Sequence, residues 1–260
     1  MAAFAFASAI SLLAAAPGAT GGVVSLNLCT DELVLLVARP DQVRGVSYLS
    51  HLPEELALWR QARRYPANDG SMLAAAARRP ALVVTMGSAG RDQARLAAAV
   101  GARLLVLPYP ASLADIAASV RRVGRATGNV GRAEAIVASM RSAVRNAPGG
   151  AVDAMWLDGA GRTLSPSSLG AAWLRLAGLA QRSVAGDQVT LEAMLTRPPT
   201  VVVQSRYRAG QMSSATGWLR HPAARRVARA RTLPTDGRRW TCAGPTLLPE
   251  ILRLRRALAR

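Results

Sequence analysis

The stretch SLADIAASVRRVGRATGNVGRAEAIVASMRSAVRN, residues 112–146, decides how this chain is organised. Apolar side chains recur at helical spacing in both halves, as at Ile116, Val120 and Met140, and Pro148 follows the end of the pattern. Three glycines near the middle are compatible with one long helix or with two consecutive helices. Helices average about 11–12 residues, so residues 111–147 are predicted to form a bridging helix between two parts of the chain.

Outward from this segment, short strand-like runs alternate with helical ones on both sides. The helix nearest the N-terminus is expected to open at Thr30 or Asp31 and to end before Pro40. Short loops between such units indicate mostly parallel sheets in an α/β fold. A short internal repeat supports two related lobes, because residues 73–84 and 191–202 each read as a helix, an Arg-Pro stop and a strand. The predicted strands are 23–26, 42–47, 81–85, 103–107, 154–157 and 201–204.

The organisation predicted is an export signal at 1–21, an N-terminal α/β lobe at 22–110, the bridging helix at 111–147 and a C-terminal α/β lobe at 148–260. Residues 1–16 are apolar or small, and Pro17 and Gly18 break the run before a small-residue cleavage zone. No basic residue precedes the run, which suggests that the true start codon lies elsewhere. A periplasmic protein is therefore expected, processed at the signal.

The formal net charge is +18, and all 33 basic residues are arginines. They are dispersed, and aromatic side chains make up 4% of the chain, so a composition biased toward Arg and Ala is favoured over a nucleic-acid surface. The charge could still attract an anionic ligand. No nucleic-acid partner is predicted, although a basic nucleic-acid-binding protein remains the less favoured alternative.

Motifs for catalysis are lacking in the sequence. It contains no Gly-x-Ser-x-Gly, P-loop or His-Glu-x-x-His pattern, and two histidines are too few for a metal-ion site. The prediction is that the protein is not an enzyme and holds no resident metal or cofactor. The alternative is an exported thiol-dependent enzyme with Cys29 as nucleophile and His51 as base.

Five segments together resemble one family, in order along the chain. These are VVSLNLCTDELVLLVARPDQVRGVSYLS (23–50), RRPALVVTMGS (78–88), VGRATGNVGRAEAIVASM (123–140), LEAMLTRPPTVVV (191–203) and RRWTCAGPTLLPEI (238–251). The set resembles the substrate-binding proteins of ABC importers for iron chelates and vitamin B12, the class III periplasmic binding proteins. The resemblance implies two Rossmann-like lobes joined by one long helix, with a ligand cleft between them. It also implies a monomer that captures cobalamin, a ferric siderophore or haem for an inner-membrane permease.

The resemblance also implies where the permease would dock. Members of this family usually carry a Glu on the outer face of each lobe, in the helix before the Arg-Pro stop. Glu192 matches that position in the second lobe, whereas Leu73 stands there in the first. Docking through Glu192 is therefore expected, and docking through the first lobe is in doubt.

In such a fold the ligand contacts loops at the carboxyl ends of the strands. Tyrosine and tryptophan there could pack on a large ring ligand, and arginines could pair with its carboxylates. The predicted ligand-binding residues are Asn27, Cys29, Thr30, Tyr48, His51, Ser88, Arg91, Arg206, Tyr207, Arg208, Arg239 and Trp240.

Cys29 and Cys242 are the only cysteines, and both are expected on cleft loops of opposite lobes. Export favours oxidation, so one hypothesis is a disulfide across the edge of the cleft. Two separate buried thiols, or free thiols facing the ligand, are the alternatives.

Overall fold

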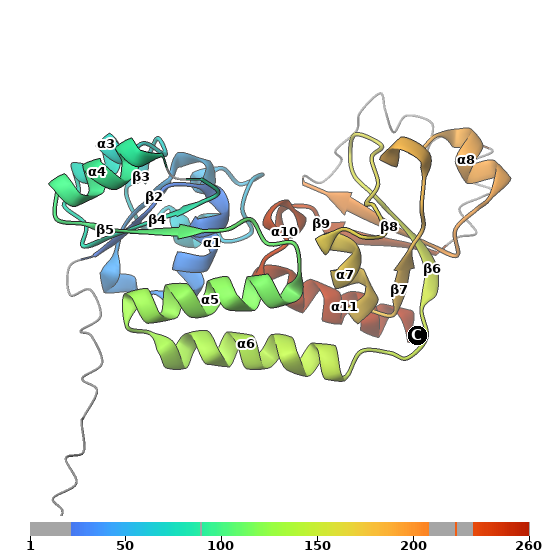
Figure 1. Ribbon diagram of the computed structural model, residues 1–260. Helices are drawn as coiled ribbons and strands as arrows, with labels where there is room; N and C mark the ends of the chain where they lie inside the picture. The colour runs from blue at the N-terminus through green and yellow to red at the C-terminus, as the bar shows by residue number, and fades with distance from the viewer. Residues whose placement is uncertain (1–21, 89, 208–221, 223–230, 260) are drawn as a thin grey trace, which may run out of the picture.

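The computed structural model describes residues 22–88, 90–207, 222 and 231–259. These residues form two α/β lobes that lie side by side, with a pair of helices running beneath both of them (Figure 1). The predicted two-lobed fold is confirmed. The predicted export signal at 1–21 lies outside the described residues. Among the helices that are described, none combines the length and apolar character that a membrane span requires.

The N-terminal lobe contains a five-stranded parallel sheet in the order β3-β2-β1-β4-β5. Its β-branched runs are buried on both faces, as expected for parallel strands covered by helices. The strands are β1 (Val23–Ser25), β2 (Val43–Ser47), β3 (Ala67–Asn68), β4 (Leu82–Met86) and β5 (Arg103–Leu107). The helices are α1 (Leu28–Val37), α2 (Trp59–Ala62), α3 (Met72–Ala76) and α4 (Arg91–Ala99).

The C-terminal lobe contains a four-stranded parallel sheet in the order β7-β6-β8-β9. β7 and β9 are not predicted from the sequence. The strands are β6 (Val152–Leu157), β7 (Leu179–Gln181), β8 (Val201–Arg206) and β9 (Arg231–Asp236). The helices are α7 (Leu169–Leu176), α8 (Leu191–Thr196), α10 (Arg238–Cys242) and α11 (Leu248–Leu258).

The connection between the lobes is a helical hairpin: the alternative of two consecutive helices is confirmed, and a single long helix over 111–147 is wrong. Helix α5 (Leu113–Thr127) ends at Gly128, whose φ of 74° is the left-handed conformation that glycine adopts without strain. Helix α6 (Val130–Arg145) then runs back alongside α5 toward the C-terminal lobe (Figure 1). The helices pack closely because Gly124 faces Ala133, where an added Cβ would lie 2.4 Å from the Ala133 Cβ.

The hairpin also carries the hydrophobic core from one lobe into the other. Val120 of α5 and Val137 of α6 belong to the same buried cluster as Leu35 in α1 and Trp173 in α7. An ion pair between Arg121 and Glu134, at 2.7 Å, closes one side of the hairpin. The lobes therefore share a packed base of two helices and are not connected by a single helix alone.

Candidate ligand cleft between the lobes

The two sheets present the carboxyl ends of their strands to each other. Strand β5 of one lobe and strand β9 of the other point toward each other (Figure 1). Strand order reverses between β1 and β4 in one lobe and between β6 and β8 in the other. Ligands of open α/β sheets bind outside the carboxyl ends of the strands at such reversals. The candidate site is therefore the space that these strand ends border.

A disulfide joins the two lobes at the edge of this space. Cys29, in the first turn of α1, is bonded to Cys242 at the end of α10, with the two Cα atoms 5.3 Å apart. The disulfide hypothesis is confirmed, and the alternatives with free thiols are wrong for this structure. Cys29 is consequently neither a thiol ligand nor the nucleophile that a thiol-dependent enzyme would need.

A buried carboxylate adds a second link between the lobes. Glu32 of α1 accepts a hydrogen bond from the backbone N–H of Thr246, at 3.0 Å, and its side chain is fully buried. Burial raises the pKa of Glu32, and the Thr246 N–H opposes part of that rise. Gly244 leaves the room for this carboxylate, because an added Cβ would lie 2.4 Å from Oε1 of Glu32.

A third link comes from an arginine of the C-terminal lobe. Arg238 donates to the carbonyl oxygen of Pro53, at 3.1 Å, while its guanidinium also pairs with Asp236. Together with the disulfide and Glu32, this contact fixes α10 and the loop after it against the N-terminal lobe. Neither Glu32 nor Arg238 is predicted as a site residue, because nothing in the sequence indicates which polar groups cross between lobes.

The turn before α1 is fixed to the neighbouring strand. Asn27 caps the helix by accepting from the Thr30 N–H at 3.1 Å, and its amide contacts the Thr85 hydroxyl of β4 at 3.3 Å. Thr30 itself is buried, with its hydroxyl 2.7 Å from that of Ser25. The prediction that Thr30 binds ligand is therefore wrong, because its hydroxyl is used to build the helix start.

Asp31 fixes the loop that carries Tyr48 and His51. Its Oδ2 accepts from the Ser47 N–H at 3.0 Å, from the Ser47 hydroxyl at 2.6 Å and from the Ser50 hydroxyl at 2.5 Å. Burial raises the pKa of Asp31 to about 6, although the serine hydrogen bonds favour the charged form. Asp31 is a positioning residue for this cleft loop.

The raised pKa of Asp31 predicts a dependence of stability on pH. Because the folded protein binds this proton more tightly than the unfolded chain, stability falls as pH rises from about 4 through 6 and then levels off. We expect Asp31 to contribute a loss of about 1 kcal/mol between pH 5 and pH 7. Urea unfolding at several pH values should show this slope in the wild type and a shallower one in Asp31→Asn.

A matched control for this experiment is Asp92→Asn, which removes an exposed carboxylate of α4. It should leave the slope between pH 5 and pH 7 as it is in the wild type. Equal slopes in Asp31→Asn and the wild type would contradict the role of Asp31.

Aromatic side chains stand exposed at two strand ends of the N-terminal lobe. Tyr48 follows β2 and is 53% exposed, and Tyr109 follows β5 and is 76% exposed. The Tyr109 ring lies against Gly87, whose φ is 97° and where an added Cβ would approach the ring to 2.9 Å. Tyr109 is missed by the sequence prediction, although the rule of strand ends that selected Tyr48 applies equally to the Pro108–Pro110 segment after β5.

Polar residues at other strand ends are partly exposed, and their role in ligand binding stays a prediction. Ser88 after β4, Arg91 at the start of α4 and Arg206 at the end of β8 are exposed, and Arg206 bonds to the Gln204 side chain at 2.6 Å. The Nε2 atom of His51 is buried and has no hydrogen-bond partner among the described residues. Tyr207 is half-buried, with its hydroxyl 3.4 Å from that of Thr241.

Trp240 is not a ligand platform, contrary to the prediction. Helix α10 turns its ring inward, where it is buried, packs against Trp156 at 5.6 Å between ring centroids and donates to the Thr235 hydroxyl at 2.9 Å. Arg239 is half-buried, and its guanidinium donates a hydrogen bond to the Thr246 carbonyl oxygen at 2.5 Å. This contact holds the side chain against the C-terminal lobe. Arg208 lies outside the described residues.

The exposed side chains of these strand-end loops are two phenol rings, a hydroxyl and guanidinium groups. Phenol rings can pack on apolar rings, and guanidinium groups can pair with carboxylates. Among the described residues, no group of three or more His, Cys, Asp and Glu side chains is placed to hold a metal ion.

Two parallel-sheet lobes that face each other over a helical base define the class III periplasmic binding-protein fold. Solved structures with this fold match nearly the whole chain. They include the periplasmic haem-binding protein HutB of Vibrio cholerae, with a TM-score of 0.71, 14% identity and coverage of 92% of this chain and 99% of that one. They also include the periplasmic vitamin B12-binding protein BtuF of Vibrio cholerae, with a TM-score of 0.65, 16% identity and coverage of 94% of this chain and 98% of that one.

A further match is the periplasmic haem-binding protein BhuT in complex with two haems, with a TM-score of 0.65, 18% identity and coverage of 91% of this chain and 97% of that one. No protein-family model matches the chain, and no curated protein matches its sequence. At these identities the likeness establishes the fold.

Proposed function

We propose that this protein is the periplasmic substrate-binding component of an ABC importer, and that it binds its substrate rather than transforming it. The observation that carries this proposal is the pair of parallel-sheet lobes with opposed strand ends, the same fold as proteins described as binding haem or vitamin B12. The fixed joint between the lobes supports capture with little rearrangement of one lobe against the other, which lowers the ordering cost of binding.

The substrate class that we propose is a large metal chelate or corrinoid: haem, cobalamin or a ferric siderophore. Tyr48 and Tyr109 offer exposed rings at two strand ends, and Arg91 and Arg206 offer exposed cations for acidic substituents. Each ring that packs on the ligand would contribute about 0.5–1.5 kcal/mol beyond the area that it buries.

The permease would dock against Glu192 in this proposal. Glu192 is exposed in the first turn of α8, the helix that precedes β8. The corresponding helix of the other lobe is α3 before β4, and there Leu73 is 77% exposed. A docking surface that is charged on one lobe and apolar on the other would fit a permease with one basic and one apolar contact.

Titration of the processed protein with haemin, cyanocobalamin and a ferric siderophore tests the proposal. We expect one of the three to bind with a change in its absorbance spectrum. In Tyr48→Ala/Tyr109→Ala its affinity should fall about tenfold or more, because two ring contacts are lost. The measurement is the dissociation constant from the absorbance titration, supported by the spectrum of protein purified from the native periplasm.

Leu96→Ala is the control, since it removes an exposed apolar side chain of α4 rather than of a strand-end loop. Its affinity should equal that of the wild type. If none of the three compounds binds, the proposed substrate class is wrong. If one binds equally well to the double variant, the tyrosines do not form the site.

A further inference from the structure

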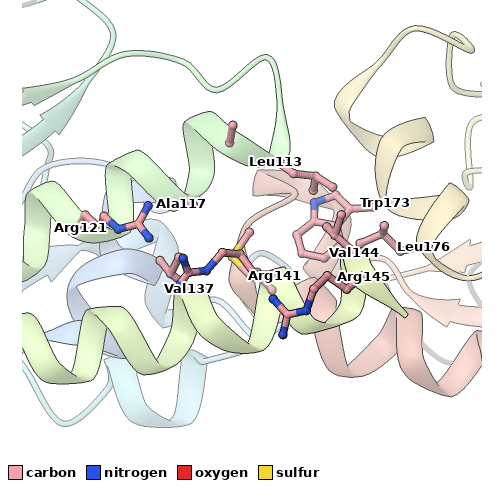
Figure 2. Close-up of a pocket in the computed structure, with 11 residues that line it drawn as sticks. Leu113, Ala117, Arg121, Val137, Arg141, Val144, Arg145, Trp173 and Leu176 are labelled. Atoms are coloured by element: carbon pink, nitrogen blue, oxygen red, sulfur yellow. The ribbon is translucent and has the colours of Figure 1, made fainter. Parts of the chain in front are cut away.

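A second hollow lies on the helical base of the molecule. It has a volume of about 510 Å³ and opens between the hairpin and α7 (Figure 2). Every lining residue belongs to α5, α6 or α7, so no strand-end loop contributes to it. We name it the hairpin groove. A cavity of this size lies within the range of pockets that bind small molecules.

The hairpin groove has an apolar floor and one apolar wall. Val137, Met140 and Trp173 are buried core side chains that border it from beneath the surface. Leu176 lies beside Trp173 on the α7 side (Figure 2). Val144 of α6 lines the groove and is 49% exposed. This surface would gain stability from an apolar molecule that displaced water from it.

Three arginines of the hairpin complete the lining. Arg121 is already paired with Glu134, and Arg141 approaches the same carboxylate only to 4.0 Å. Arg145 makes no ion pair with any residue that the structure describes. Arg141 and Arg145 stand four residues apart on one helix, where like charges repel each other. An anionic group placed between them would relieve that repulsion and could accept hydrogen bonds from both guanidinium groups.

We propose that the hairpin groove binds a small amphipathic anion, a molecule with a slender apolar body and one carboxylate head group. The body lies on Leu113, Ala117 and Val144, apolar lining side chains that are partly exposed. The carboxylate lies between Arg141 and Arg145. The apolar surface is a hollow rather than a flat face, so it fits a single molecule better than a bilayer surface. Because the groove is lined from both the hairpin and α7, an occupant would also brace the base against the C-terminal lobe.

Dodecanoate is a suitable probe, with dodecyltrimethylammonium as the cation of equal chain length and butyrate as the short carboxylate. Isothermal titration calorimetry below the critical micelle concentration should show that dodecanoate binds and that the other two bind far more weakly. Affinity for dodecanoate should fall about tenfold or more in Arg141→Gln/Arg145→Gln, because two charge-assisted hydrogen bonds are lost. Val144→Glu, which places an acid in the groove, should have the same effect.

Arg122→Gln/Arg132→Gln is the matched control, because it removes two exposed arginines of the hairpin that do not line the groove. It should bind dodecanoate as the wild type does. Three outcomes would overturn the proposal: no binding of dodecanoate, equal loss of affinity in both double variants, or binding only to vesicles of anionic lipid. A wild-type dimer that Val144→Glu converts to monomer, seen by sedimentation, would instead assign the groove to a second copy of this chain.

Discussion

Replacing both Cys29 and Cys242 with alanine is expected to lower the free energy of unfolding by about 2–5 kcal/mol. The disulfide closes a loop across a sequence separation of 213 residues, so its loss releases a large amount of chain entropy in the unfolded state. For a chain of this size the melting temperature should drop by about 5–15 °C. Thermal unfolding followed by circular dichroism measures the change.

Reductant supplies the control for this prediction. Dithiothreitol should lower the melting temperature of the wild type toward that of the alanine variant and should leave the variant unaffected. A wild-type protein that melts at the same temperature as the variant, under oxidising conditions, would show that the bond adds nothing to stability.

Gly244→Ala should be the most damaging single glycine substitution at the joint between the lobes. The φ of Gly244 is −87°, a value that any residue adopts, so the cost is steric. The new methyl group would lie 2.4 Å from Oε1 and 2.9 Å from Cδ of the buried Glu32 side chain. Forcing that carboxylate or its loop aside should cost about 1–3 kcal/mol, measured by urea unfolding.

A double-mutant cycle separates this clash from a general weakness of the loop. In Glu32→Ala the opposing side chain is gone, so adding Gly244→Ala should then cost little, and the two effects should not add. Gly131→Ala is the control, because that glycine faces open space in α6 and alanine there should stabilise the helix by about 0.5–1 kcal/mol. Additive effects at positions 32 and 244 would contradict the contact.

The alternation of strands and helices was enough to predict the α/β class and the two lobes, because burial of parallel strands leaves uninterrupted apolar runs such as 82–84 and 201–203. The connector was harder. In the sequence, Gly128 could lie inside one long helix or form the left-handed end of a shorter one. The hairpin depends on the close contact between Gly124 and Ala133, which lie on different helices. Such contacts between segments leave no trace in local periodicity.

The candidate site was predictable as a set of strand ends but not side chain by side chain. Both Tyr48 and Trp240 were predicted to bind ligand. Tyr48, directly after β2, is exposed, whereas Trp240 lies in α10 after β9 and is buried on Trp156. Position along a strand gives the edge of the sheet at which a residue lies. The direction of its side chain depends on the local backbone and on packing with other elements. For Trp240 the local backbone is helix α10, and the packing partner is Trp156 of β6.

The two connections between the lobes together constrain how they can move. The backbone enters the C-terminal lobe after α6, and the bond between Cys29 and Cys242 ties the lobes at a second point. Two rigid bodies held at two points keep one easy rotation, about the line that joins those points. The Glu32 and Arg238 contacts and the shared core keep any such rotation small, and the lobes cannot draw apart while the disulfide is intact.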